Sequence, residues 1–175
     1  VIPDRHDPEF FKGHKVHKGK AREVVWYGYN QNAGGLKQCK YSLARFGLNL
    51  SIISDSPVQI KSKEDTGWEE RWTKWDLATV NDEIRKSDMV IMPSSLHPLH
   101  KFKSNNKTVN AWFLRMPVAN SAEEMERFLD PAEREREAEK NYKAAMANWT
   151  VDKSVGEYKA FIERLKNGRE ISNKT

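Results

Sequence analysis

Residues 23–54, "EVVWYGYNQNAGGLKQCKYSLARFGLNLSIIS", carry the clearest pattern of secondary structure in the chain. The stretch opens with "EVVWYG", a short apolar run rich in β-branched and aromatic residues, which predicts a buried strand. After the loop "YNQNAGG", Leu36, Cys39, Leu43 and Phe46 recur at helical spacing, and Gly47 is a helix stop signal. The run "LNLSIIS" predicts a second strand. Strand, loop, helix and strand form a βαβ unit, which requires parallel strands.

The same alternation continues along the chain. Further strands are predicted near 72–75, 88–93 and 116–120, and helices at 77–86 and 104–114. We therefore predict an α/β fold. It is a Rossmann-like three-layer α/β/α arrangement with a parallel sheet of about five strands and extra C-terminal helices. Ligands bind beyond the carboxyl ends of the strands in such sheets.

Composition divides the chain into three parts. Residues 1–22 carry six Lys/Arg against three Asp/Glu and several Pro and Gly, which indicates a basic linker or arm. Residues 23–130 form the Rossmann-like domain. Residues 131–175 are expected to be helices that pack on it. The first starts with the cap Asp130 and with Pro131, and the last is amphipathic and capped by Ser154.

Charge and cysteine content narrow the function classes. The 175-residue chain has a net charge of +5 and a pI of about 9.2, which favours anionic partners such as nucleic acid, nucleotides or an acidic membrane surface. Its single cysteine, Cys39, excludes an internal disulfide and a cysteine-rich zinc site. No apolar run reaches the ~20 residues of a membrane span, and no signal peptide is visible. We expect a cytoplasmic protein, and association with a membrane surface stays open.

Two segments are candidates for binding an anion. Gly34, Gly35 and Lys37 lie in the loop after the first strand. The sequence favours equally a tight turn and a loop whose backbone N–H groups bind an anion. The second is "KSNNKTVNAWFLRMPVAN", residues 103–120. It has six Lys/Arg (85, 86, 101, 103, 107 and 115) around it, against Asp88 alone. Lysines at a helix start oppose the helix dipole, so we favour an anion site over a plain cap at Ser104, Asn105 and Asn106.

Histidines and tryptophans were weighed for other chemistry. His14 with His17, and His97 with His100, form HxxH pairs, but neither has an acidic or thiol partner nearby, so no metal site is expected. Trp68, Trp72 and Trp75 next to basic residues would suit stacking on single-stranded bases. Tryptophans beside a strand more often pack in the hydrophobic core or at its rim, and we prefer that interpretation.

The order of these pieces resembles the C-terminal, donor-binding half of GT-B glycosyltransferases. "KTVNAWFLRMPV", residues 107–118, keeps the spacing of a helix that many retaining members write as Lys-x-x-Glu, then Ala-Met-Ala-x-Gly-x-Pro-Val. "DMVIMPS" is similar to the family's strand ending in Pro-Ser. "VIPD" is similar to the phrase that joins the two GT-B halves, and "SVGEYKAFIERL" to a closing helix.

The resemblance implies a function and assigns residues. The position of Lys107 helps to hold the donor diphosphate, and Asn110 stands where a Glu usually binds the ribose hydroxyls. Arg115 stands where Gly is usual, and Gly34, Gly35 and Lys37 fall in the loop that approaches the donor. The implied activity is sugar transfer from a nucleotide-sugar to an acceptor, without a metal or other cofactor. The N-terminal acceptor-binding half is absent, so the chain alone is expected to be inactive, and no catalytic residue is assigned.

Two alternatives stay open. The first is a nucleic-acid-binding module that uses the basic segments and the tryptophans, although no RRM, KH or helix-turn-helix signature supports it. The second is an inactive GT-B remnant with a structural role, which the departures at Asn110 and Arg115 favour.

Overall fold

The computed structural model describes residues 5–11, 13–93 and 104–172, with the backbone alone for the last six of these. It contains a five-stranded, all-parallel sheet with the strand order β3-β2-β1-β4-β5. The strands are β1 (Glu23–Tyr27), β2 (Asn49–Ser54), β3 (Glu70–Lys74), β4 (Met89–Ile91) and β5 (Val118–Ala119). This topology confirms the predicted Rossmann-like α/β fold.

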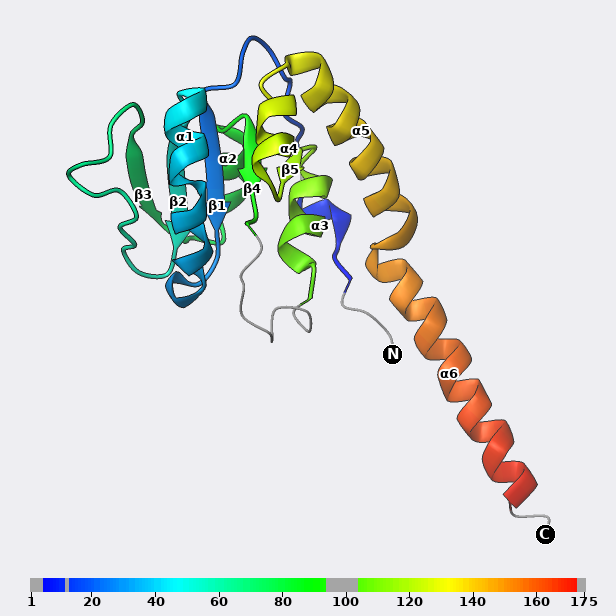
Figure 1. Ribbon diagram of the computed structural model, residues 1–175. Helices are drawn as coiled ribbons and strands as arrows, with labels where there is room; N and C mark the ends of the chain where they lie inside the picture. The colour runs from blue at the N-terminus through cyan, green and yellow to red at the C-terminus, as the bar shows by residue number, and fades with distance from the viewer. Residues whose placement is uncertain (1–4, 12, 94–103, 173–175) are drawn as a thin grey trace.

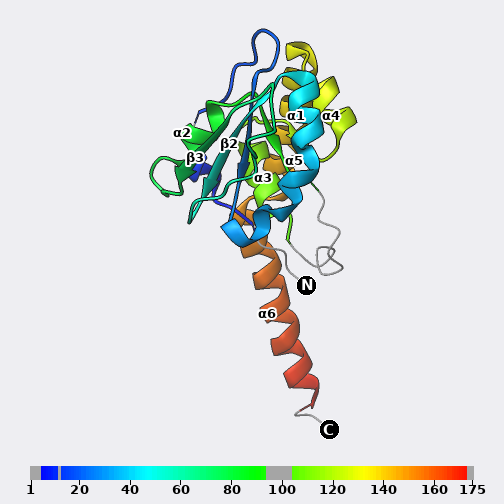
Figure 2. The ribbon, with the colours of Figure 1, turned by 60° about the vertical axis from the view of Figure 1, so that its left-hand side comes forward.

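Helices cover both faces of the sheet, as Figure 2 shows for α1 and α2 on opposite sides. Alternate side chains of β1 enter the two halves of the core. Val24 and Trp26 pack with residues of α1 and α4, and Val25 and Tyr27 pack with residues of α2 and α3. The helical elements are η1 (Pro8–Phe10), η2 (Asn30–Cys39), α1 (Lys40–Phe46), α2 (Val80–Arg85), α3 (Asn106–Phe113), α4 (Ala122–Arg127), α5 (Pro131–Asn148) and α6 (Val151–Ser172).

The connection after β1 differs from the prediction of a loop up to residue 35. It is the 3₁₀ helix η2, which contains Gly34 and Gly35 and continues directly into α1. The buried residues of η2 are Ala33, Leu36 and Cys39, so every third side chain faces the sheet. That spacing matches the three residues per turn of a 3₁₀ helix, which explains why this geometry prevails here over a loop.

The basic N-terminal segment, for which the sequence left a linker and an arm open, is a packed arm over its described residues. The His6 N–H donates to the Trp149 carbonyl over 3.0 Å, and the Val151 N–H donates back to the His6 carbonyl over 2.9 Å. The Phe11 ring stacks on Phe113, with 5.2 Å between ring centroids. The basic side chains of the arm lie mostly at the surface and stay solvated, so these apolar and backbone contacts can fix the arm on the domain.

The two C-terminal helices behave differently. Helix α5 packs against α3 and buries Ala138 and Ala145, as expected. Helix α6 starts at Val151, ahead of the predicted cap Ser154, and runs away from the domain (Figure 1). Its apolar side chains are 46–53% exposed: Val155, Tyr158, Phe161, Ile162 and Leu165. The prediction that both helices pack on the domain is therefore wrong for α6, whose apolar stripe finds no surface in this chain among the described residues.

Candidate functional site

A pocket of about 380 Å³ opens at the carboxyl edge of the sheet. This edge holds the starts of η2 and α3, both in the lower part of Figure 1, and residues of both elements line the pocket. The strand order reverses direction around β1, because β2 lies on one side of it and β4 on the other. Ligands of open α/β sheets bind at such a switch point. Among the described residues, the pocket is lined by Tyr27, Gly28, Tyr29, Asn32, Asp55, Trp75, Lys107 and Asn110.

Lys107 reaches the end of β1 from the first turn of α3. Its ammonium nitrogen lies 5.0 Å from the centroid of the Trp26 ring. A Cβ atom added to Gly28, whose φ is +149°, would stand 2.9 Å from that nitrogen. The positive φ favours glycine at this position, and a larger residue would displace the flexible end of the lysine side chain. The cation lies over the end of β1, close to an aromatic face.

Asn110 lies three residues further along α3 and faces the same pocket. Its Oδ1 atom is buried and has no hydrogen-bond partner among the residues that the structure describes. A buried acceptor without a partner costs about 1–3 kcal/mol, so native proteins rarely leave one unsatisfied without a reason. A hydroxyl or N–H group of a ligand in the pocket would supply the missing donor.

Tyr27 forms the floor of the pocket. Its phenol is buried and donates a hydrogen bond to the Lys107 carbonyl, which fixes the first turn of α3 against β1. Burial raises the pKa of the Tyr27 phenol far above its usual value, because the phenolate would lose its hydration. Tyr27 therefore stays neutral and positions α3; it does not act as a base.

Lys107 and Asn110 are the two lining residues that the sequence predicted as site residues, and the other six were missed. Three of the six, Tyr29, Asp55 and Trp75, follow the ends of β1, β2 and β3. The Asp55 Oδ1 atom accepts from the Asn30 N–H over 2.7 Å, and the Trp75 N–H donates to the Ser54 carbonyl over 2.8 Å. Tyr29 is 66% exposed and Trp75 is 40% exposed. Their shared position just beyond parallel strands was the available signal, since such residues meet at one edge of the sheet.

The predicted site residues divide into two groups. Lys107 and Asn110 come together in the pocket, whereas Gly34, Gly35 and Lys37 lie in η2 and do not line it. Gly35 instead faces the chain after β4, since a Cβ atom there would lie 3.4 Å from the Pro93 carbonyl oxygen. The Lys37 side chain is exposed.

The start of α3 also differs from the prediction. The sequence predicts a helix that starts at Ser104, but its N-cap is Asn105, which makes no side-chain cap bond, and Ser104 does not cap it. Ser104 and Asn105 are exposed, and Asn106, the first helical residue, is half-buried. None of the three lines the pocket.

The basic cluster around α3 is smaller in space than in sequence. Arg85 pairs with Asp82, Lys86 pairs with Glu83, and Arg115 pairs with Glu139. Lys101 and Lys103 lie outside the described residues, as do His97 and His100. Of the six cations, Lys107 lines the pocket. Ion pairs with neighbouring acids thus neutralise much of the local charge read from the sequence.

The tryptophans and histidines are placed as follows. Trp68 is buried, Trp72 is half-buried against the core, and Trp75 lies at the rim of the pocket. His14 is exposed, and His17 is buried beside Arg115. Within the described ranges, no group of three His, Cys, Asp or Glu side chains could hold a metal ion. In the same ranges, no helix combines the length and apolar character needed to cross a membrane.

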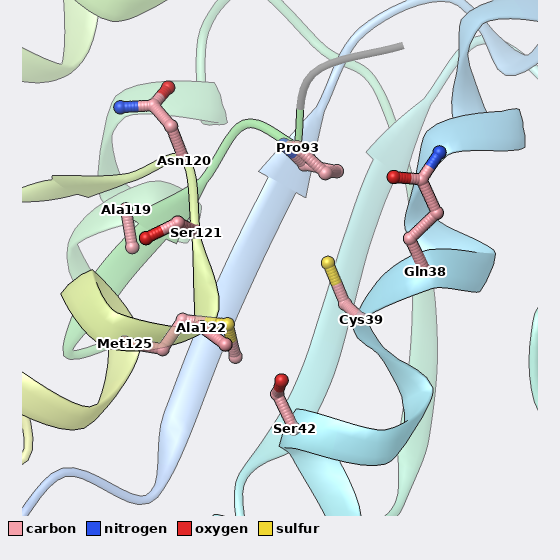
Figure 3. Close-up of a pocket in the computed structure, with 9 residues that line it drawn as sticks. All are labelled: Gln38, Cys39, Ser42, Pro93, Ala119, Asn120, Ser121, Ala122 and Met125. Atoms are coloured by element: carbon pink, nitrogen blue, oxygen red, sulfur yellow. The ribbon is translucent and has the colours of Figure 1, made fainter. Parts of the chain in front are cut away.

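A second, smaller pocket of about 170 Å³ lies between the η2–α1 junction and the segment from β5 to α4 (Figure 3). Cys39 and Ser42 line it on one side, and Asn120 and Ser121 on the other. Burial raises the pKa of the Cys39 thiol to about 11, so the thiol is protonated and unreactive near neutral pH. The Ser121 hydroxyl accepts from the Glu124 N–H and caps α4. These groups have structural roles.

Comparisons with known proteins add no assignment. No protein-family model matches the chain, and no curated protein matches it.

Proposed function

We propose that this domain is the donor-binding half of a GT-B glycosyltransferase and binds a nucleoside diphosphate-sugar in the 380 Å³ pocket. One observation carries the proposal: Lys107 and Asn110, the two positions that the family motif links to the donor, both line the same pocket at the carboxyl edge of the sheet. The unsatisfied Asn110 oxygen beside a lysine fits a ligand that has both hydroxyl groups and negative charge.

The backbone at Arg115 supports the resemblance. Its φ is +56°, and it is the only residue other than glycine with positive φ among those described. The family motif has Gly at this position, where a left-handed residue costs least. The chain therefore keeps the backbone turn of the motif although the side chain differs.

The proposed chemistry depends on charge and position. When a sugar leaves its nucleotide, negative charge grows on the diphosphate. A fixed cation at Lys107 and the N-terminal dipole of α3 stabilise that charge. The acceptor and the remaining catalytic groups belong to the N-terminal half of such enzymes, so this domain supplies donor binding alone.

Calorimetry with UDP, GDP, ADP and their sugar conjugates tests the proposal. We expect at least one diphosphate to bind, and the Lys107→Ala variant to bind it at least 10-fold more weakly. Lys37→Ala is the matched control, because Lys37 is exposed and does not line the pocket. The proposal fails if no nucleotide binds, or if Lys107→Ala and Lys37→Ala change the affinity equally.

A further inference from the structure

The geometry points to Asp55 as the acceptor for the ribose hydroxyls of the bound nucleotide, an inference that rests on the proposed function. The resemblance links ribose binding to the position of Asn110, where this chain has an uncharged amide, and it assigns no role to Asp55. Hydrogen bonds from the ribose hydroxyls to Asp55 would make the pocket selective for ribonucleotides over deoxyribonucleotides.

Asp55 lies at the position that suits a ribose. Asp55 directly follows β2, the neighbour of β1 on the side away from the switch point, and its carboxylate lines the pocket. In doubly wound sheets, an acid at the end of the second strand is placed to accept hydrogen bonds from a ribose whose phosphate lies at the first strand. Here β1 ends next to the Lys107 ammonium. The phosphate would therefore lie at the end of β1, and the ribose at the end of β2 beside Asp55.

The charges that line the pocket favour one orientation of the ligand. The pocket is lined by a cation from α3 and by a carboxylate from the β2 end. A phosphate beside Asp55 would meet like charge and is disfavoured, so the phosphate belongs near Lys107. A carboxylate accepts hydrogen bonds and donates none, so it suits the two O–H donors of a ribose. This polarity gives the ligand one orientation.

A backbone hydrogen bond holds the Asp55 carboxylate in place. The Asp55 Oδ1 atom accepts the Asn30 N–H over 2.7 Å, which ties the end of β2 to the first residue of η2. The carboxylate is thereby oriented before any ligand binds, and preorganised groups lose less entropy on binding. Tyr29 and Trp75 expose aromatic rings on the same pocket and offer surfaces on which a base can stack.

The test compares ligands that differ by one hydroxyl. Calorimetry measures the affinity of the intact domain for UDP, GDP and ADP, for their 2′-deoxy and 3′-deoxy counterparts, and for inorganic diphosphate. The variant is Asp55→Asn, because an asparagine oxygen can still accept the Asn30 N–H. The matched control is Asp76→Asn, which changes an acid that follows β3, outside the pocket lining, and that accepts the Ala78 N–H.

We expect the native domain to prefer a ribonucleotide over its deoxy counterparts by about 10-fold, the usual effect of one charge-assisted hydrogen bond. Asp55→Asn should reduce the ratio of the affinities for the ribonucleotide and its deoxy counterparts, while Asp76→Asn should leave this ratio unchanged. Inorganic diphosphate should bind Asp55→Asn at least as tightly as the native domain.

Several results would overturn the assignment. One is an equal ratio in the native domain and in Asp55→Asn, and another is the absence of any preference for the ribose form. If Asp55→Asn weakens the binding of guanine nucleotides alone, the carboxylate recognises the base and not the ribose. If nucleotides bind through Lys107 without a ribose preference, only this inference fails. If no nucleotide binds, the proposed function fails with it.

Discussion

The Nε2 atom of His17 lies 3.0 Å from the carbonyl oxygen of Arg115. This contact joins the N-terminal arm to the left-handed turn that closes α3 and leads into β5. In the neutral imidazole, the Nε2–H can donate to the carbonyl. The arm therefore stabilises the turn at the far end of the helix that carries Lys107 and Asn110.

The His17 contact predicts a pH-dependent stability. Burial lowers the pKa of His17 below its usual 6.5, and the bond to the Arg115 carbonyl offsets this only in part. The unfolded chain therefore binds more protons than the folded chain between the two pKa values. The contribution of neutral His17 to the free energy of unfolding is fully present above about pH 6.5. It falls as the pH drops toward the lowered pKa of His17 in the folded chain.

Urea denaturation between pH 7.5 and pH 5 measures this slope. His17→Gln should flatten it, because the amide N–H₂ can keep the bond to the carbonyl without titrating in this range. His14→Gln changes an exposed ring and should leave the slope as it is. An unchanged slope in His17→Gln would assign the dependence to other groups.

Substitutions at Arg115 should rank by backbone strain. A residue other than glycine pays roughly 1–2 kcal/mol in the left-handed region. Two contacts of the Arg115 side chain offset part of this strain. The guanidinium pairs with Glu139, and its central carbon lies over the Tyr142 ring, 4.1 Å from the centroid. Contacts of this kind give about 0.5–1 kcal/mol each.

Arg115→Gly should therefore change the free energy of unfolding by less than about 1 kcal/mol, because relief of strain offsets the lost contacts. Arg115→Val keeps the strain, loses the contacts and should cost about 2 kcal/mol or more. Chemical denaturation measures both variants. Equal stabilities would show that the turn adopts another conformation in solution.

Gly28→Ala should disturb the pocket through Lys107. The new Cβ atom would stand 2.9 Å from the lysine nitrogen, at a φ of +149° that alanine rarely adopts. We expect destabilisation of about 1–2 kcal/mol, together with weaker diphosphate binding because the ammonium must move. Gly34→Ala is the matched control, since a Cβ atom there meets nothing within 4 Å. Calorimetry and denaturation should separate the two variants, and identical behaviour would contradict the observed position of Lys107.

The sequence predicted the fold better than the site. The apolar runs at 23–28 and 48–54 sufficed for a parallel sheet, because continuous β-branched segments separated by a helix have few other arrangements. Lys107 and Asn110 were found because they lie close together on one helix. Tyr29, Asp55 and Trp75 come from three strand ends, and only the folded sheet brings them to one pocket. The glycines at 34 and 35 were misleading, because a 3₁₀ helix occupies the expected loop.

Arg134 should be one of the most sensitive positions for stability. Its side chain is fully buried and donates to the carbonyls of Phe128, Leu129, Gly19 and Lys18. These bonds join the arm, the end of α4 and the start of α5. Arg134→Met leaves buried acceptors without donors and should cost about 3–5 kcal/mol of unfolding free energy. Arg136→Met, an exposed position two residues away, should change it by less than about 0.5 kcal/mol. Similar losses in both variants would contradict this role.

Removing most of α6 should leave the domain intact. From residue 151 to 166, its side chains are exposed apart from the half-exposed Ser154. The contacts that fix its first turns include the bond from the Val151 N–H to the His6 carbonyl and the bonds from Arg5 to Ser154 and Glu157. A chain that ends after Glu157 keeps them. We expect its unfolding free energy to lie within about 0.5 kcal/mol of that of the full chain, since exposed positions contribute little.

A chain that ends after Asp130 is the contrasting control. It also lacks α5, which covers α3 and buries Arg134, Ala138 and Ala145. We expect that chain to lose its cooperative unfolding transition, because part of the core becomes exposed. Circular dichroism during heating distinguishes the two truncations. A large loss of stability on ending after Glu157 would mean that the apolar stripe of α6 is covered in solution.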